Sequence, residues 1–167
     1  MGRYLYNKII TFLLQKVKLN KGSEGMTSKY FKIQELVSKK VYEKYGNKSW
    51  EFIDQRLIKV LDLLREHFNK PITVNDWCFG GNLHQRGLRA NKDELVANKK
   101  DYYISQHCLG KAVDFNVKGL SAQEVYEEII KNKEKFYLIS RIENIKDTPT
   151  WCHIDVANID SFKIFNA

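Results

Sequence analysis

Two segments of the chain place histidine and aspartate where a metal ion can be bound. In residues 112–117 apolar and polar side chains alternate as in a half-buried β-strand, and Asp114 lies on the polar side. In residues 151–156 the same alternation places His153 and Asp155 on the polar side. An imidazole and a carboxylate therefore emerge on the polar sides of two strands that can be neighbours in one sheet.

A second histidine precedes the first of these strands. Gly110 lies between His107 and Asp114, and a glycine lets the chain turn there so that the imidazole faces the carboxylate. Two imidazoles and one carboxylate, with a fourth position left for water, are typical of a catalytic zinc site rather than a closed structural one. We therefore expect His107, Asp114 and His153 to bind Zn²⁺, which lowers the pKa of its water to about 7 and polarises a scissile carbonyl.

The same residues carry a resemblance to a known family. It rests on two motifs, Ser105-x-His107-x-x-Gly110-x-Ala112-x-Asp114-Phe115 and Trp151-x-His153-Ile154-Asp155, which are similar to those of the zinc D-Ala-D-Ala carboxypeptidases. That family includes phage endolysins and vancomycin-resistance dipeptidases, and it shares its fold with the hedgehog signalling domain. The similarity covers about residues 30–158, including Ile72–Trp77 and Arg86–Arg89, and is greatest to phage-type members.

The resemblance implies roles for several residues. Zinc would be held by His107, Asp114 and His153, and Arg89 would contact a substrate carbonyl or carboxylate near the metal. Further substrate contacts are expected from Ser105, Arg86 and Trp151. The implied substrate is the peptide of bacterial peptidoglycan, cut either by a carboxypeptidase that releases terminal D-alanine or by an endopeptidase that cleaves the stem peptide.

The chain departs from the family at the position of the general base. Many relatives have Glu or Asp three residues before the last histidine, whereas this chain has Thr150. Glu143 ends the preceding strand and is the first candidate, because it can reach the zinc-bound water across the hairpin; Asp147 in the turn is the second. Asp155 is the expected partner that orients an imidazole.

Several of these residues also have a purely structural interpretation. The chain has three cysteines and no CxxC pair, which argues against a disulfide scaffold and against a structural cysteine-zinc site. Cys108 and Cys152 adjoin expected ligands, so thiolate coordination is an alternative, but the alternation points Cys152 to the core. Arg86 and Arg89 can be solvated loop charges, and Glu143 can pair with Arg141.

Periodicity indicates the elements that must position the site. Apolar residues at helical spacing predict a helix over 30–45 and another from a Ser49 cap to Phe68, and the capping box Ser121-Ala122-Gln123-Glu124 predicts a third. Strands are expected at 72–77, 112–117, 136–143 and 151–156, with a long loop between the first two. This order predicts an α+β fold with N-terminal helices packed on a small antiparallel sheet, and the resemblance implies the hedgehog/DD-peptidase fold.

Length and charge bound the remaining expectations. With 167 residues the chain is expected to form one peptidase domain over 26–167, preceded by an N-terminal extension or helix with a linker over 1–25. The apolar stripe in 1–25 is too short to span a bilayer, so it is expected to pack as a helix, with weak membrane-surface contact as the alternative. The net charge of +8 favours polyanions, but the lysines are scattered, so no specific nucleic-acid partner is expected.

The residues and the resemblance together predict a monomeric zinc peptidase. It would be synthesised in the cytoplasm and act at the cell wall, in phage lysis or as a virion component. The main alternative is a zinc-binding module of the same fold that binds the cell wall without hydrolysis, which the absence of an acid at Thr150 would permit. A basic nucleic-acid binder is a third alternative and would need aromatic stacking platforms beside its lysines.

Overall fold

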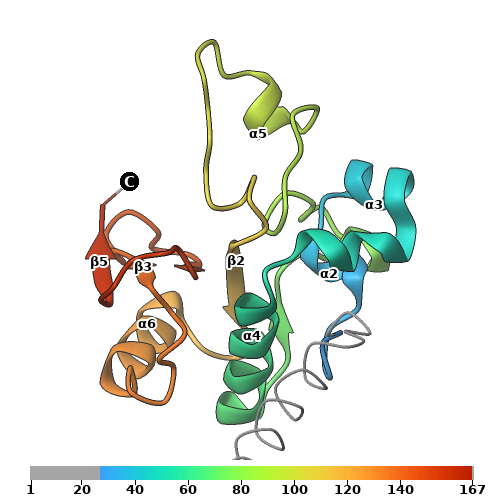
Figure 1. The fold of residues 1–167 in the computed structure, drawn as a ribbon. Helices are drawn as coiled ribbons and strands as arrows, with labels where there is room; N and C mark the ends of the chain where they lie inside the picture. Colours follow the sequence, from blue (N-terminus) through green and yellow to red (C-terminus); the bar gives the residue numbers. More distant parts are fainter. Residues whose placement is uncertain (1–26, 167) are drawn as a thin grey trace, which may run out of the picture.

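A five-stranded mixed sheet forms the centre of the α+β fold (Figure 1). The computed structural model describes residues 27–166, so the predicted extension over 1–25 lies outside the described residues. The strands are β1 (Ile72–Thr73), β2 (Ala112–Val117), β3 (Arg141–Glu143), β4 (Cys152–Asp155) and β5 (Lys163–Phe165), and their order across the sheet is β1-β2-β4-β3-β5.

The sheet is antiparallel except at one edge. β1 pairs with β2, β2 with β4 and β4 with β3 in antiparallel fashion, whereas β3 and β5 are parallel. The predicted antiparallel sheet is therefore mixed, because this edge pair is parallel. β5 was not predicted, because it has three residues and only Phe165 among them is half-buried, which is too little to show an alternation.

The first predicted helix is interrupted. Instead of one helix over 30–45 the chain forms α2 (Ile33–Leu36) and α3 (Lys39–Tyr45). Val37 between them is extended and bridges to Leu88, and the hydroxyl of Ser38 caps α3 by accepting a hydrogen bond from the amide of Val41. Tertiary pairing with the Leu88 segment thus overrides the local helical pattern.

The second predicted helix begins later than expected. Residues 46–52 form a 3₁₀ helix (η1, Gly46–Phe52), and α4 (Gln55–Phe68) begins after Asp54, whose carboxylate accepts a hydrogen bond from the amide of Arg56 at 2.9 Å. The predicted Ser49 cap is wrong, because Ser49 is buried inside η1. A carboxylate at this end is also stabilised by the helix dipole.

The elements predicted for the second half of the chain agree more closely with the structure. β2 has the predicted bounds, and α6 (Ala122–Lys131) begins with the predicted capping box between Ser121 and Glu124. The strand predicted over 136–143 is shorter, because Phe136 packs in the core as part of the turn that follows α6. Two short helices complete the set, η2 (Trp77–Phe79) and α5 (Glu94–Ala97).

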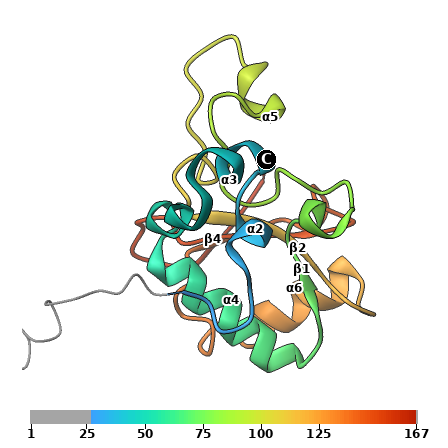
Figure 2. The same cartoon turned by 90° about the vertical axis from the view of Figure 1, so that its right-hand side faces the viewer.

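The core lies between α4, α6 and one face of the sheet (Figure 2). Fully buried side chains come from α4, α6 and the central strands: Leu57, Ile58, Leu61, Leu64, Ile129, Phe115 and Ile154. The long connection over 80–111, which carries α5, extends on the opposite side (Figure 2). One face of the sheet is thereby sealed by helices, and the other is left for polar side chains. Within residues 27–166 no helix is both long and apolar enough to cross a membrane.

Candidate metal centre

Asp114 and His153 lie directly opposite each other in the middle of the sheet. They are Cα partners in the antiparallel pair of β2 and β4, and side chains of such partners point to the same face. Nδ1 of His153 lies 2.7 Å from Oδ1 of Asp114. The alternation expected from the sequence is confirmed, because Val113, Phe115 and Ile154 of the same strands are in the core.

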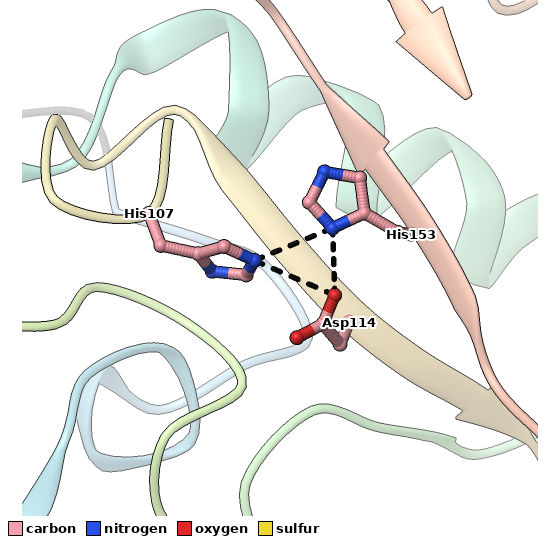
Figure 3. Close-up of side chains that lie close together, drawn as sticks. All are labelled: His107, Asp114 and His153. Carbon is pink, nitrogen blue, oxygen red and sulfur yellow. Dashed lines mark hydrogen bonds and ion pairs between the residues drawn. The ribbon is translucent and has the colours of Figure 1, made fainter. Parts of the chain in front are cut away.

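His107 reaches the pair from a tight turn that precedes β2. Gly110 closes this turn at a φ of +66°, and a Cβ on it would lie 1.9 Å from the backbone oxygen of Phe52. Only glycine fits this close approach and this backbone conformation. The turn directs His107 back over the strand, so that its Nε2 lies 3.4 Å from Oδ1 of Asp114 and 3.3 Å from Nδ1 of His153 (Figure 3).

The three side chains can bind a metal ion. One ligand atom from each of His107, Asp114 and His153 lies within 4.8 Å of the other two, and no other such group occurs among the described histidines, cysteines, aspartates and glutamates. The predicted convergence is confirmed. Cys152, by contrast, is not part of this group, because it is buried on the core face of β4, where burial also raises the pKa of its thiol.

Hydrogen bonds orient the imidazole of His107 toward the centre of the group. Its Nδ1 lies 2.9 Å from the backbone oxygen of Gly87, so Nδ1 carries the proton and donates it to that oxygen. Nε2 is then unprotonated and directs its lone pair toward Asp114 and His153. A carbonyl that fixes the tautomer in this way is a usual feature of histidines that bind metals.

The electrostatics of the group favour a cation between its members. Burial raises the pKa of Asp114, but the close contacts with the imidazoles of His107 and His153 outweigh burial and hold that pKa below its usual range. Burial lowers the pKa of His153, yet its hydrogen bond with Asp114 and the nearby carboxylates of Asp155 and Glu143 outweigh burial and raise the pKa to about 9. Burial lowers the pKa of His107. A proton on His153 thus supplies the positive charge that a metal ion would supply in its place.

Arg89 contacts a metal-ligand candidate rather than open space. Its Nη2 donates to Oδ2 of Asp114 at 2.8 Å, and its Nε donates to the backbone oxygen of Gln85. Asp114 therefore presents Oδ1 to the histidines while Oδ2 is held by the guanidinium. The guanidinium also lines the cavity described below, and its contact with substrate stays a prediction.

The two candidates for the general base differ in position. Glu143 lines the cavity, and its Oε2 lies 3.8 Å from Nδ1 of His153. Burial is the main cause that raises the pKa of Glu143, helped by the negative charges of Asp114 and Asp147 against the opposing effect of His153. Asp147 is exposed in the β3–β4 turn and is absent from the cavity lining, so the geometry favours Glu143.

A cavity of about 450 Å³ opens beside the three ligands. Of the residues expected to bind substrate, Ser105 and Trp151 line it, as do Arg89 and Glu143. Arg86 does not: it donates to the side chain of Asn116, and its guanidinium lies 5.9 Å from the ring of Trp151. Arg86 would therefore influence a substrate only indirectly, through its contact with Trp151.

Asp155 is shared between two partners. Its Oδ2 lies 3.9 Å from Nε2 of His153, beyond hydrogen-bond distance, and 2.8 Å from Nε of Arg141. The predicted orientation of His153 by Asp155 is therefore an ion-pair contact, and Arg141 is the closer partner. Arg141 and Phe165 both line the cavity, and the sequence pattern identified neither as part of the site. Their positions follow from the pairing of β3 with β4 and β5.

Comparisons of the chain with protein-family models, with curated proteins and with solved structures found no match. The motifs and the geometry of the site are therefore the observations that bear on function.

Proposed function

We propose that the protein is a zinc peptidase that hydrolyses peptide bonds of bacterial peptidoglycan. The observation that carries the proposal is the convergence of His107, Asp114 and His153 at a cavity that also contains Glu143. Two imidazoles and a carboxylate suit zinc and leave a coordination position for water or substrate. The motif resemblance to zinc D-Ala-D-Ala carboxypeptidases supports the choice of substrate.

The residues around the cluster divide the chemistry among them. A zinc ion held by the three side chains supplies a Lewis acid that polarises a carbonyl and lowers the pKa of water. Glu143 is positioned to accept the proton of the attacking water, because its carboxylate lies beside His153. Its pKa is also raised toward neutral pH, which suits a general base. Arg89 fixes the carboxylate of Asp114 through the hydrogen bond to Oδ2.

The test is hydrolysis of purified peptidoglycan, with the released fragments identified by mass spectrometry. Activity should disappear after treatment with a chelator, return with zinc, and be absent in His153→Ala. Release of D-alanine would identify a carboxypeptidase, and release of stem-peptide fragments an endopeptidase. Wall hydrolysis that is unaffected by the chelator would overturn the proposal. Stoichiometric zinc without hydrolysis would instead support the binding module of the same fold.

A further inference from the structure

An apolar groove lies next to the metal cavity, and the proposed chemistry does not use it. Of the described residues, Arg89 alone lines both. The groove has a volume of about 370 Å³, and most of its lining is apolar: Val41, Tyr45, Phe52, Leu88, Cys108 and Leu109. No acidic side chain from the described part of the chain lines it, and the guanidinium of Arg89 is already held by Asp114. The groove therefore suits an apolar ligand.

Large apolar side chains in the groove are exposed. The exposed fraction is 40% for Tyr45, 40% for Phe52 and 48% for Leu109. The rings of Tyr45 and Phe52 meet edge to face, with their centroids 4.9 Å apart. Val41 and Leu88, which line the same groove, are buried. Adjacent exposed side chains of this kind mark a surface on which another segment packs.

The walls of the groove belong to the backbone that holds the metal centre. Cys108 and Leu109 directly follow His107 in its turn. Leu88 directly follows Gly87, whose backbone oxygen orients the imidazole of His107. A segment that fills the groove therefore packs against the two stretches of chain that position this imidazole.

The chain itself contains a segment with a matching pattern. Ahead of the described residues, apolar side chains recur at the spacing i, i+3, i+4 and i+7: Ile10, Leu13, Leu14 and Val17. Amphipathic helices that bind in apolar grooves present their anchors at this spacing. Gln15 falls on the opposite side of such a helix. Because these residues lie outside the described range, the pattern comes from the sequence.

The start of the described chain lets this segment reach the groove. The amide of Lys29 donates to Oδ2 of Asp62 at 3.0 Å, so residues 18–27 lead away from the second half of α4. The groove lies near the start of α4, where the amide of Asp54 donates to the backbone oxygen of Gly110 at 2.9 Å. Asp54 and Asp62 are about 12 Å apart along the helix. An extended chain over 18–27 spans up to about 33 Å, which exceeds that distance.

We propose that residues 9–17 bind in this groove as an amphipathic helix of the same chain, with their apolar anchors packed against Phe52 and Leu109. The inference is independent of the proposed peptidase function. Isolated helices of this length are marginal in water, so the groove supplies the packing that stabilises the helix. The tether keeps the segment at a high effective concentration, so a modest intrinsic affinity is enough to fill the groove.

Alkylation of Cys108 reports whether the groove is filled. Cys108 lines the groove and is half-buried, whereas Cys78 is a half-buried thiol outside it. The full chain is treated with iodoacetamide, and modification of each cysteine is followed by peptide mass spectrometry. Leu13→Asp places a charge among the anchors and should raise the alkylation rate of Cys108 at least about tenfold, the ratio that about 1.4 kcal/mol of docking free energy produces. Gln15→Asp is the matched control, and the rate at Cys78 should change in neither variant.

A second variant changes the groove instead of the segment. Leu109→Asp should release the segment and speed tryptic cleavage after Lys16 at least about tenfold, by the same free energy. Leu95→Asp is the matched control, because Leu95 has a similar exposed fraction of 51% and does not line the groove. Both leucines are exposed, so both variants should fold, and cooperative urea denaturation checks this.

The outcomes separate the possible occupants. Faster alkylation of Cys108 in Leu13→Asp and faster cleavage after Lys16 in Leu109→Asp, with both controls equal to the wild type, support the proposal. A rate that either change leaves unaffected, or that its control raises equally, overturns it. Protection that weakens on dilution would assign the groove to the segment of a second copy and overturn binding within one chain. These rates need neither zinc nor substrate, so the proposed function is judged separately.

Discussion

Arg89 donates a hydrogen bond to Oδ2 of Asp114 at 2.8 Å, while Oδ1 of the same carboxylate lies 2.7 Å from Nδ1 of His153. The carboxylate is thus fixed on both sides. Arg89→Met should leave Asp114 free to rotate and lower metal affinity by about 10–100-fold, as loss of an outer hydrogen-bond partner usually does. Competition with a chromophoric chelator measures this. Arg86→Met is the control, because the side chain of Arg86 donates to Asn116 and to no metal-ligand candidate, and the backbone oxygen that accepts from the amide of Asp114 is kept in this variant.

Metal binding should stabilise the fold through the three ligands. Because an ion that binds only the folded state stabilises it, excess zinc should raise the Tm of the wild-type protein. His107→Ala, Asp114→Asn and His153→Ala should each lose most of this rise. His84→Ala should keep it, since His84 is a half-exposed histidine outside the cluster. A rise of equal size in all four variants would show that zinc binds elsewhere.

Separate substitution of Glu143 and Asp147 tests which of them is the general base. Glu143→Gln should reduce peptidoglycan hydrolysis by about 10²–10⁴-fold, the usual contribution of a general base, and leave the zinc content near one per chain. Asp147→Asn should change the rate by only a few fold, because Asp147 is exposed and outside the cavity lining. The reverse result would make Asp147 the base.

The turn that carries His107 depends on a glycine. Gly110→Ala introduces a Cβ that would lie 1.9 Å from the backbone oxygen of Phe52, at a φ of +66°. Gly80→Ala is the matched control, since its φ is +87° and no atom lies within 4 Å of the added Cβ. Both changes should lower the free energy of unfolding by about 1–2 kcal/mol through backbone strain. Gly110→Ala should cost about 1–3 kcal/mol more through overlap and weaken zinc binding; chemical denaturation and chelator competition measure both.

The cap of α4 should make stability depend on acidic pH. Hydrogen bonds and charge from Arg56 hold the pKa of Asp54 below its usual range, so the charged form stabilises the folded state. This contribution is present above the unfolded-state pKa of about 3.9 and is lost as the pH falls through the lower pKa of the folded state. Asp54→Asn keeps a capping oxygen but no charge.

Accordingly, Asp54→Asn should be less stable than the wild type by up to about 1 kcal/mol at neutral pH, and the difference should shrink below pH of about 4. Urea denaturation from about pH 3 to about pH 7 measures the free energy of unfolding of both proteins. A difference that is constant with pH would mean that the ion pair with Arg56 contributes nothing to stability.

The metal ligands were predictable because their pattern is local. In β2 and β4 every second residue is apolar and buried, so Asp114 and His153 could be assigned to the other face without knowledge of the fold. Gly110 marked the turn that returns His107 to the strand. Each of these predictions requires only residues that are close together in the sequence.

The remaining parts of the site depend on contacts between distant segments. The break at Val37 comes from its bridge to Leu88, which no local propensity reveals. Arg141 and Phe165 enter the cavity because β3 pairs with β4 and, in parallel, with β5. The carbonyl of Gly87 that orients His107 belongs to an irregular loop, and such backbone contacts leave no pattern in side-chain types.

The alternation of β2 and β4 means that one strand register both buries the apolar side chains and brings the metal-ligand candidates together. A slip of one residue between these strands would turn Phe115 outward and Asp114 inward, so it would damage the apolar interior and scatter the ligands in the same step. Zinc uptake would then act as a reporter of correct strand alignment, and misfolded chains could be distinguished from native ones by their inability to retain the ion.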